Sequence, residues 1–211
     1  MYEEYSLGVS KRMTVDSTDI ERRQFLTGTA AVLGGLGAGV AAIPFVSTFQ
    51  PSERAKAIGA PVEANIDQIE PGQRVTYKWR GKPVWIIRRT EEQLAALEQM
   101  RDILADPDST SSVQPEFAEN SWRSLNQEYL VLVGICTHLG CSPSFRPLAG
   151  DVVMGADSVG GFYCPCHGAK FDLSGRVYAG VPAPTNMDVP PYKFLNESRI
   201  LIGELAEGEG A

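Results

Sequence analysis

GICTHLGCSPS (residues 134–144) and FYCPCHGAKFD (residues 162–172) together contain every cysteine and every histidine of this 211-residue sequence. The chain has four Cys and two His, and each segment holds two Cys and one His. Thiolates and imidazoles are the side chains that bind zinc and iron–sulfur clusters. Their concentration in two short segments predicts that two loops meet around one metal centre.

Three kinds of site could use these six side chains. A zinc site would take four of them as ligands. An all-cysteine iron–sulfur cluster would take the four thiolates and leave both histidines unused. A mixed [2Fe–2S] site would take one Cys and one His from each loop, and would leave one Cys per loop over. The mixed site explains the pattern best, because it uses both histidines and leaves one Cys in each loop, where the two could pair with each other. A zinc site explains neither this spare pair nor the apolar N-terminal segment.

Short β-type segments surround the two loops. An apolar run at 129–135 (YLVLVGI) leads into the first loop, and a shorter one at 160–163 leads into the second. Pro-Gly and Gly-Lys-Pro breaks separate several of the other segments. The further strands that the pattern predicts are 62–69, 74–79, 84–89, 192–194 and 199–202.

Residues 90–104 have a helical pattern. Thr90 is a candidate N-cap, acidic residues follow it in the first turn, and apolar residues then recur at helical spacing. Residues 108–127 have no clear period and predict a long loop, which is unusual unless it covers something. The fold class predicted for residues 61–211 is therefore an all-β domain with one inserted helix.

The N-terminal part predicts a single transmembrane helix. Residues 27–49 contain no charge, and 23 residues would form a helix of about 35 Å, long enough to span a bilayer. Arg22 and Arg23 precede this span and resemble a twin-arginine export signal. We expect an uncleaved anchor. A plain anchor or a cleaved signal are the alternatives.

The membrane segment also divides the chain into parts. More basic residues precede the span than follow it closely, which places residues 1–26 in the cytoplasm and the part after the span in the periplasm. Residues 50–60 are polar and small and predict a flexible linker. The net charge of −7 argues against a nucleic-acid partner, because phosphate binding needs a basic surface.

CTHLGC at 136–141 and CPCHG at 164–168 resemble the Rieske iron–sulfur subunit of cytochrome bc complexes (ubiquinol–cytochrome c reductase), in its proteobacterial form. The resemblance extends to the Arg-Arg signal, the Gly/Ala-rich anchor, RGKPVWIIRRT at 80–90 and AGVPAPTN at 179–186. The second Cys in each loop separates this group from ring-hydroxylating Rieske oxygenases. The resemblance implies an all-β Rieske domain with one [2Fe–2S] cluster.

The resemblance also implies a role for each residue of the loops. It assigns Cys136 and Cys164 to one iron and His138 and His167 to the other, with the two histidines facing quinol. It pairs the two remaining cysteines, Cys141 and Cys166, as a disulfide. The residues that it places around the cluster are Leu139, Gly140, Pro165, Gly168, Ala169, Phe171, Pro182 and Pro184.

The function implied by the resemblance is that of an oxidoreductase (translocase) subunit. Such a subunit takes one electron from a membrane quinol, releases a proton and reduces cytochrome c1. The implied partners are cytochrome b, cytochrome c1, quinol and the lipid bilayer of a bacterial cytoplasmic membrane, in a dimeric complex with the cluster domain in the periplasm. One alternative is the Rieske subunit of an arsenite-oxidase-type enzyme, and another is a zinc-stabilised anchor protein without redox function.

Two positions depart from the family pattern. Ala169 and Phe171 stand where members commonly carry Ser and Tyr, whose hydroxyls donate to sulfur atoms and stabilise the reduced cluster. The sequence therefore predicts a reduction potential below that of typical ubiquinol-linked members. The alternative is that a backbone N–H or Lys170 replaces the missing donors.

Overall fold

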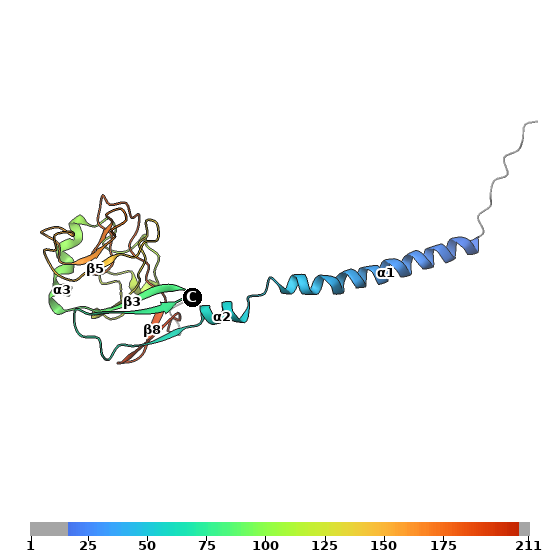
Figure 1. Cartoon of the computed structure of the whole chain (residues 1–211), viewed down its shortest axis with the longest axis horizontal. Coiled ribbons are helices and arrows are strands. Elements are labelled where there is room, and N and C mark those ends of the chain that lie inside the picture. The colour runs from blue at the N-terminus through green and yellow to red at the C-terminus, as the bar shows by residue number, and fades with distance from the viewer. Residues whose placement is uncertain (1–16, 207–211) are drawn as a thin grey trace, which may run out of the picture. The chain divides into compact units, whose positions relative to one another are not determined.

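The computed structural model describes residues 17–206, in two compact units divided between Ser52 and Glu53 (Figure 1). The first unit contains one long helix, α1 (Ser17–Ser47). An 18-residue stretch within Thr18–Ser47 has a mean hydropathy of 1.8, and the helix is long and apolar enough to cross a membrane. The helix starts earlier than the predicted span at 27–49, since residues around the arginine pair are also helical. Residues 1–16 of the predicted cytoplasmic segment lie outside the described part.

The segment at 50–60 contains a helix that the sequence analysis missed. Residues Glu53–Gly59 form α2, and Lys56 pairs with Glu53 at 2.7 Å on its exposed surface. Glu, Arg, Lys and Ala are all good helix formers, so this short stretch can be helical even between two breaks. The prediction of a linker at 50–60 did not include this helix, and flexibility of the segment stays a prediction.

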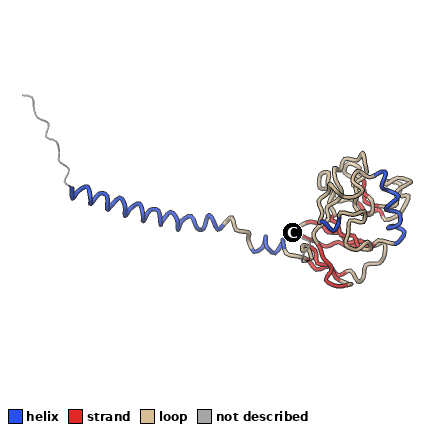
Figure 2. The backbone as a smooth tube through the Cα atoms, turned by 180° about the vertical axis from the view of Figure 1, so that it is seen from behind, coloured by secondary structure: helices blue, strands red, loops and turns tan. Residues whose placement is uncertain are grey.

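The head consists of three small antiparallel sheets surrounded by long loops (Figure 2). The first has the order β1-β9-β8, the second β2-β3-β4 and the third β5-β6-β7. Their strands are β1 (Val62–Asn65), β2 (Arg74–Trp79), β3 (Lys82–Arg88), β4 (Tyr129–Val133), β5 (Ser144–Arg146), β6 (Gly161–Tyr163), β7 (Lys170–Phe171), β8 (Tyr192–Asn196) and β9 (Arg199–Ile202).

The strand predictions agree with most of this architecture. The predicted strands 74–79 and 199–202 have the observed bounds, and β1 is shorter than the predicted 62–69. The sequence pattern does not predict β5 and β7, which have three and two residues and no apolar period of their own. The all-β class with a small helical insertion is confirmed.

The inserted helix is shorter than predicted. Thr90 caps α3 (Glu91–Ala96) through a capping box with Gln93, as the sequence indicated. The α-helix then changes to a 3₁₀ helix, η1 (Leu97–Ile103), and a second 3₁₀ turn, η2 (Glu116–Ala118), lies in the long loop.

The long loop at 108–127 does cover another segment, the turn 172–176 that follows β7. The fully buried Arg123 donates from Nη1 to the carbonyls of Ser174 and Gly175, both at 3.3 Å. Inside this turn Arg176 and Asp172 form an ion pair of 2.7 Å with both side chains fully buried. Buried charges are rare unless they are paired and hydrogen-bonded, as they are here. The loop therefore fixes the chain that leaves the second Cys/His segment.

Candidate metal centre

The third sheet brings the two Cys/His loops to one end of the head. The first loop ends where β5 begins, and the second begins where β6 ends. Because β5 and β6 are antiparallel, with Ser144 opposite Tyr163, these two ends lie side by side. The expected meeting of the two loops is confirmed.

The first loop is a tight turn closed by backbone hydrogen bonds. The N–H of Cys136 donates to the carbonyl of Cys141 at 2.7 Å, and the N–H of Gly140 donates to the carbonyl of Cys136 at 3.1 Å. Gly140 has φ +83°, a left-handed conformation that favours glycine. The turn thus requires a glycine in the place where CTHLGC supplies one.

The second loop repeats this turn. The N–H of Cys164 donates to the carbonyl of Ala169 at 2.8 Å, and the N–H of Gly168 donates to the carbonyl of Cys164 at 2.9 Å. Gly168 has φ +78°, close to the value at the corresponding glycine of the first loop. The two loops therefore present their side chains from equivalent backbones.

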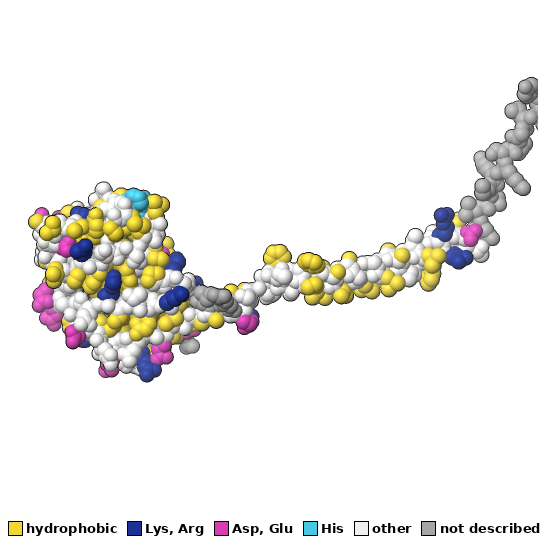
Figure 3. Space-filling view, viewed as in Figure 1, with side chains coloured by type: hydrophobic (Ala, Val, Ile, Leu, Met, Phe, Trp, Pro, Cys, Tyr) yellow, Lys and Arg dark blue, Asp and Glu magenta, His cyan; other side chains and the backbone are white. Residues whose placement is uncertain are grey.

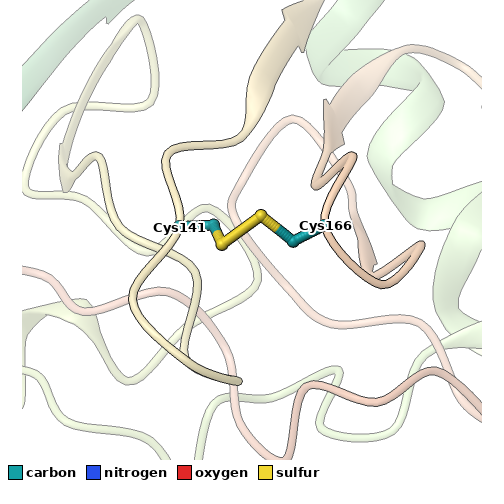
Figure 4. Close-up of a disulfide and its surroundings, with 2 residues drawn as sticks. All are labelled: Cys141 and Cys166. Carbon is teal, nitrogen blue, oxygen red and sulfur yellow. A yellow bond between two sulfur atoms is a disulfide. The ribbon is translucent and has the colours of Figure 1, made fainter.

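A disulfide joins the loops (Figure 4). It connects Cys141 to Cys166 across 25 positions of sequence, so the predicted pairing is confirmed. The sulfur atoms of Cys141, Cys164 and Cys166 lie within 4.8 Å of one another. Because two of these three share the disulfide, this sulfur group is not itself a set of metal ligands.

The two remaining cysteines and the two histidines form pairs. Cys136 and Cys164 are free thiols, each only 2% exposed, and burial raises the pKa of Cys136, whose thiol contacts that of Cys164. The rings of His138 and His167 lie 4.7 Å apart at 85°. Two thiols and two imidazoles, each like beside like, are the donor set of a mixed-ligand [2Fe–2S] cluster, and these residues fit that group.

The histidine end of the site lies at the surface. His167 is exposed and His138 is half-buried. Leu139 is 70% exposed beside them, and Pro165, Pro182 and Pro184 are exposed as well. Figure 3 shows histidine at the edge of the head, next to hydrophobic side chains. An imidazole in such apolar surroundings is accessible to an apolar molecule that carries a hydroxyl.

The proline-rich segment is tied to the first loop. The hydroxyl of Thr137, between Cys136 and His138, donates to the carbonyl of Thr185 at 2.7 Å. The fully buried Asn186 accepts from the N–H of Val177 at 2.8 Å and donates to Ser109 at 2.7 Å. Sequence reasoning missed both roles, although Thr137 stands inside the CTHLGC motif and Asn186 ends the AGVPAPTN segment.

The two departures from the family pattern are both in the core. Ala169 and Phe171 are fully buried, and Phe171 pairs with Phe162 across β6 and β7. Neither side chain carries a donor. The ammonium of Lys170 donates to the carbonyl of Met154 at 3.0 Å. That bond engages Lys170 with another loop, and whether Lys170 or a backbone N–H replaces the missing donors stays a prediction.

Comparison with known proteins gives matches over both parts of the chain. The family described as "Ubiquitinol-cytochrome C reductase Fe-S subunit TAT signal" matches residues 13–52, and the "Rieske [2Fe-2S] domain" matches residues 117–193. The second range includes both loops and the proline-rich segment.

Curated relatives match over most of their length. The ubiquinol-cytochrome c reductase iron-sulfur subunit of Allochromatium vinosum is 50% identical over 192 residues, which cover 91% of this chain and 93% of the relative. The protein of the same name from Bradyrhizobium diazoefficiens is 39% identical over 185 residues, covering 86% and 94%. A chain of a solved structure titled "Hyperthermophilic respiratory Complex III" has 27% identity and a TM-score of 0.47, and covers 84% of this chain and 98% of that one.

Proposed function

The chain belongs to the iron–sulfur subunits of ubiquinol–cytochrome c reductase, and on that premise we propose that Cys136, Cys164, His138 and His167 hold its [2Fe–2S] cluster. One observation carries this ligand set. Two free buried thiols contact each other, two imidazole rings lie 4.7 Å apart edge to face, and the other two cysteines are already used in a disulfide. When bound, the cluster supplies a one-electron acceptor.

The exposed histidine gives the site its chemistry with quinol. A ligand imidazole has a second nitrogen, and that of an exposed His167 is available to a quinol hydroxyl. That free nitrogen would accept the proton that the quinol loses as the cluster takes the electron. His138 is half-buried beside it and supports the same contact. The function proposed is transfer of one electron from membrane quinol to cytochrome c1, with proton release.

The proposed partners are cytochrome b, cytochrome c1, quinol and the lipid bilayer, within a dimeric complex. The apolar surface of Leu139 and the prolines beside the histidines is suited to a protein docking surface. Cytochrome b offers quinol at such a contact, and cytochrome c1 accepts the electron at a second one. A head that visits two sites needs a tether, which is the role proposed for residues 50–60.

The proposed topology places the head in the periplasm. The apolar helix α1 and the export-signal match fit a membrane-anchored subunit. Arg22 and Arg23 lie near the start of α1, which favours a cytoplasmic N-terminus and a bacterial cytoplasmic membrane. The proposed parts are residues 1–26 in the cytoplasm, 27–49 across the membrane, 50–60 as linker and 61–211 as the cluster domain.

Redox-titrated EPR of membranes, with and without an inhibitor of the quinol site, tests this function. We expect a reduced-state signal typical of a histidine-ligated [2Fe–2S] cluster, and we expect the inhibitor to change its shape. Zinc in place of iron and acid-labile sulfide would contradict the ligand set. An iron–sulfur signal that ignores the inhibitor would favour the arsenite-oxidase-type alternative.

A further inference from the structure

Trp85 lies behind the two loops and is buried in the core. It stands in the middle of β3, opposite Leu132 of β4, and is 3% exposed. Trp85 is neither a proposed cluster ligand nor part of the proposed docking surface. Its contacts reach the strands that lead into both loops.

On one side the indole packs against the chain entering the first loop. A Cβ atom on Gly134 would lie 2.6 Å from Nε1 of Trp85, closer than side-chain carbons approach. The N–H of Gly134 also donates to the carbonyl of Pro83 at 2.8 Å, which holds this backbone beside β3. Gly134 is two residues before Cys136, so the indole determines where the first loop starts.

The indole also stacks on the chain entering the second loop. The rings of Trp85 and Phe162 lie 5.5 Å apart at an interplanar angle of 21°. Phe162 is fully buried and is two residues before Cys164. It also contacts Phe145 at 5.6 Å, on the strand that leaves the first loop. The indole therefore contacts the approaches to both loops.

Arg74 also packs against these aromatic rings. The guanidinium of Arg74 lies 4.4 Å from the centre of the Trp85 ring and 5.5 Å from that of Phe145. This contact holds the aromatic side chains in one orientation. A side chain held by several contacts keeps the groups packed against it in a defined position.

We propose that Trp85 is a positioning residue, whose indole sets the spacing of the two loops and hence of Cys136 and Cys164. The proposal rests on the ligand set given above. Cluster ligands held by rigid supports keep a defined geometry, and the potential and spectrum of a cluster depend on that geometry and its surroundings. A smaller side chain at position 85 would lose contacts with both approaches and let the loops shift.

The chain contains a matched control. Trp79 is also a buried tryptophan, 7% exposed, with the guanidinium of Arg80 at 4.5 Å from its ring. A Cβ on Gly203 would lie 2.6 Å from Nε1 of Trp79, as at the other site. Gly203 follows β9 in the first sheet rather than leading into a Cys/His loop. The same substitution at the two tryptophans therefore separates core packing from cluster positioning.

The experiment compares Trp85→Phe and Trp85→Leu with Trp79→Phe and Trp79→Leu in the full-length protein in membranes. EPR g-values and the midpoint potential of the cluster are measured, together with cluster content and thermal unfolding. We expect both pairs to unfold at lower temperature, and only the Trp85 variants to shift the g-values and the midpoint. Parent values in Trp85→Leu at reduced unfolding temperature would overturn the proposal.

A second pair of variants covers the case in which Trp85→Leu does not assemble. Gly134→Ala should lose most of the cluster signal, because its new Cβ meets the indole, and Gly134→Ala combined with Trp85→Leu should recover part of it. A parent-like spectrum in Gly134→Ala, or no recovery in the double variant, would contradict the positioning role. If the parent chain itself gives no histidine-ligated signal, the ligand set fails rather than the role of Trp85.

Discussion

In the first loop the histidine is half-buried, and in the second loop it is exposed, although both loops close with the same two backbone hydrogen bonds. The equivalent bonds join Cys136 to Cys141 and Cys164 to Ala169. Gly140 and Gly168 adopt nearly the same φ. The two turns therefore have equivalent backbone conformations, and the difference in exposure between the two histidines has another origin.

The difference arises from what each loop contacts. Thr137 holds the first loop against the proline-rich segment, which covers part of it. In the second loop Pro165, Cys166 and His167 are all exposed. A repeated turn thus presents the proposed ligands from equivalent backbones, while its neighbours decide which histidine is exposed. Each prediction below disturbs one part of this comparison.

The largest effect is expected from separating the loops. Cys166→Ser removes the covalent link and should lower the free energy of unfolding by about 2–4 kcal/mol, with loss of cluster content. Iron and acid-labile sulfide per folded protein, with chemical unfolding, measure both effects. The variant with both Cys141→Ser and Cys166→Ser should match the single one, because the same bond is missing. Full cluster content in either variant would show that the sheet alone holds the loops together.

A smaller effect is expected from straining either turn. Gly140→Ala and Gly168→Ala place a side chain in the left-handed region, at a cost of about 1–2 kcal/mol each. Equal losses of stability would confirm that the turns are equivalent, and chemical unfolding measures them. Gly59→Ala, in α2 with open space around it, is the control and should not destabilise the protein. A large cost at only one of the two turns would refute their equivalence.

The contact that distinguishes the loops can be removed by itself. Thr137→Val deletes the O–H that donates to the Thr185 carbonyl, at a cost of about 1 kcal/mol. Quinol oxidation should slow because the proline-rich segment is no longer held beside the histidines. Thr137→Ser keeps the hydroxyl and should restore the rate. Equal rates in the Val and Ser variants would show that the hydrogen bond has no such role.

The loops and several strands were predictable because their signals are local. The Cys/His pattern and the Thr90 capping box each lie within a few residues of sequence. The short strands β5 and β7 depend on closure of the loops, so no local pattern indicates them. The change from α3 to a 3₁₀ helix is set by packing of Leu97 and Met100 against the core.

The supports of the site were harder to predict from sequence. Charged residues are mostly exposed, so no local pattern indicates the burial of Arg123 and Arg176. Arg123 donates to carbonyls of a distant turn, and Arg176 pairs with the nearby Asp172 and donates to the distant carbonyl of Leu97. Trp85 carries no signal in the sequence that separates it from Trp79. Which of two buried tryptophans touches the loops is determined by sheet pairing alone.

The smallest change adds one donor to the second loop. Ala169→Ser places a hydroxyl at a fully buried position whose carbonyl already accepts from Cys164. A hydrogen bond that favours the reduced cluster by about 1 kcal/mol would raise the midpoint by about 40 mV, since 59 mV corresponds to a tenfold change for one electron. Redox-titrated EPR measures the shift.

Ala64→Ser is the matched control for this change, because Ala64 is equally buried but lies in β1 of the first sheet. It should cost stability without moving the midpoint. An unchanged midpoint in Ala169→Ser would mean that backbone N–H groups already satisfy the sulfur atoms. The absence of a Ser hydroxyl at position 169 would then not lower the reduction potential of the parent protein. The two loops would be equivalent in their donors to sulfur as well as in their turns.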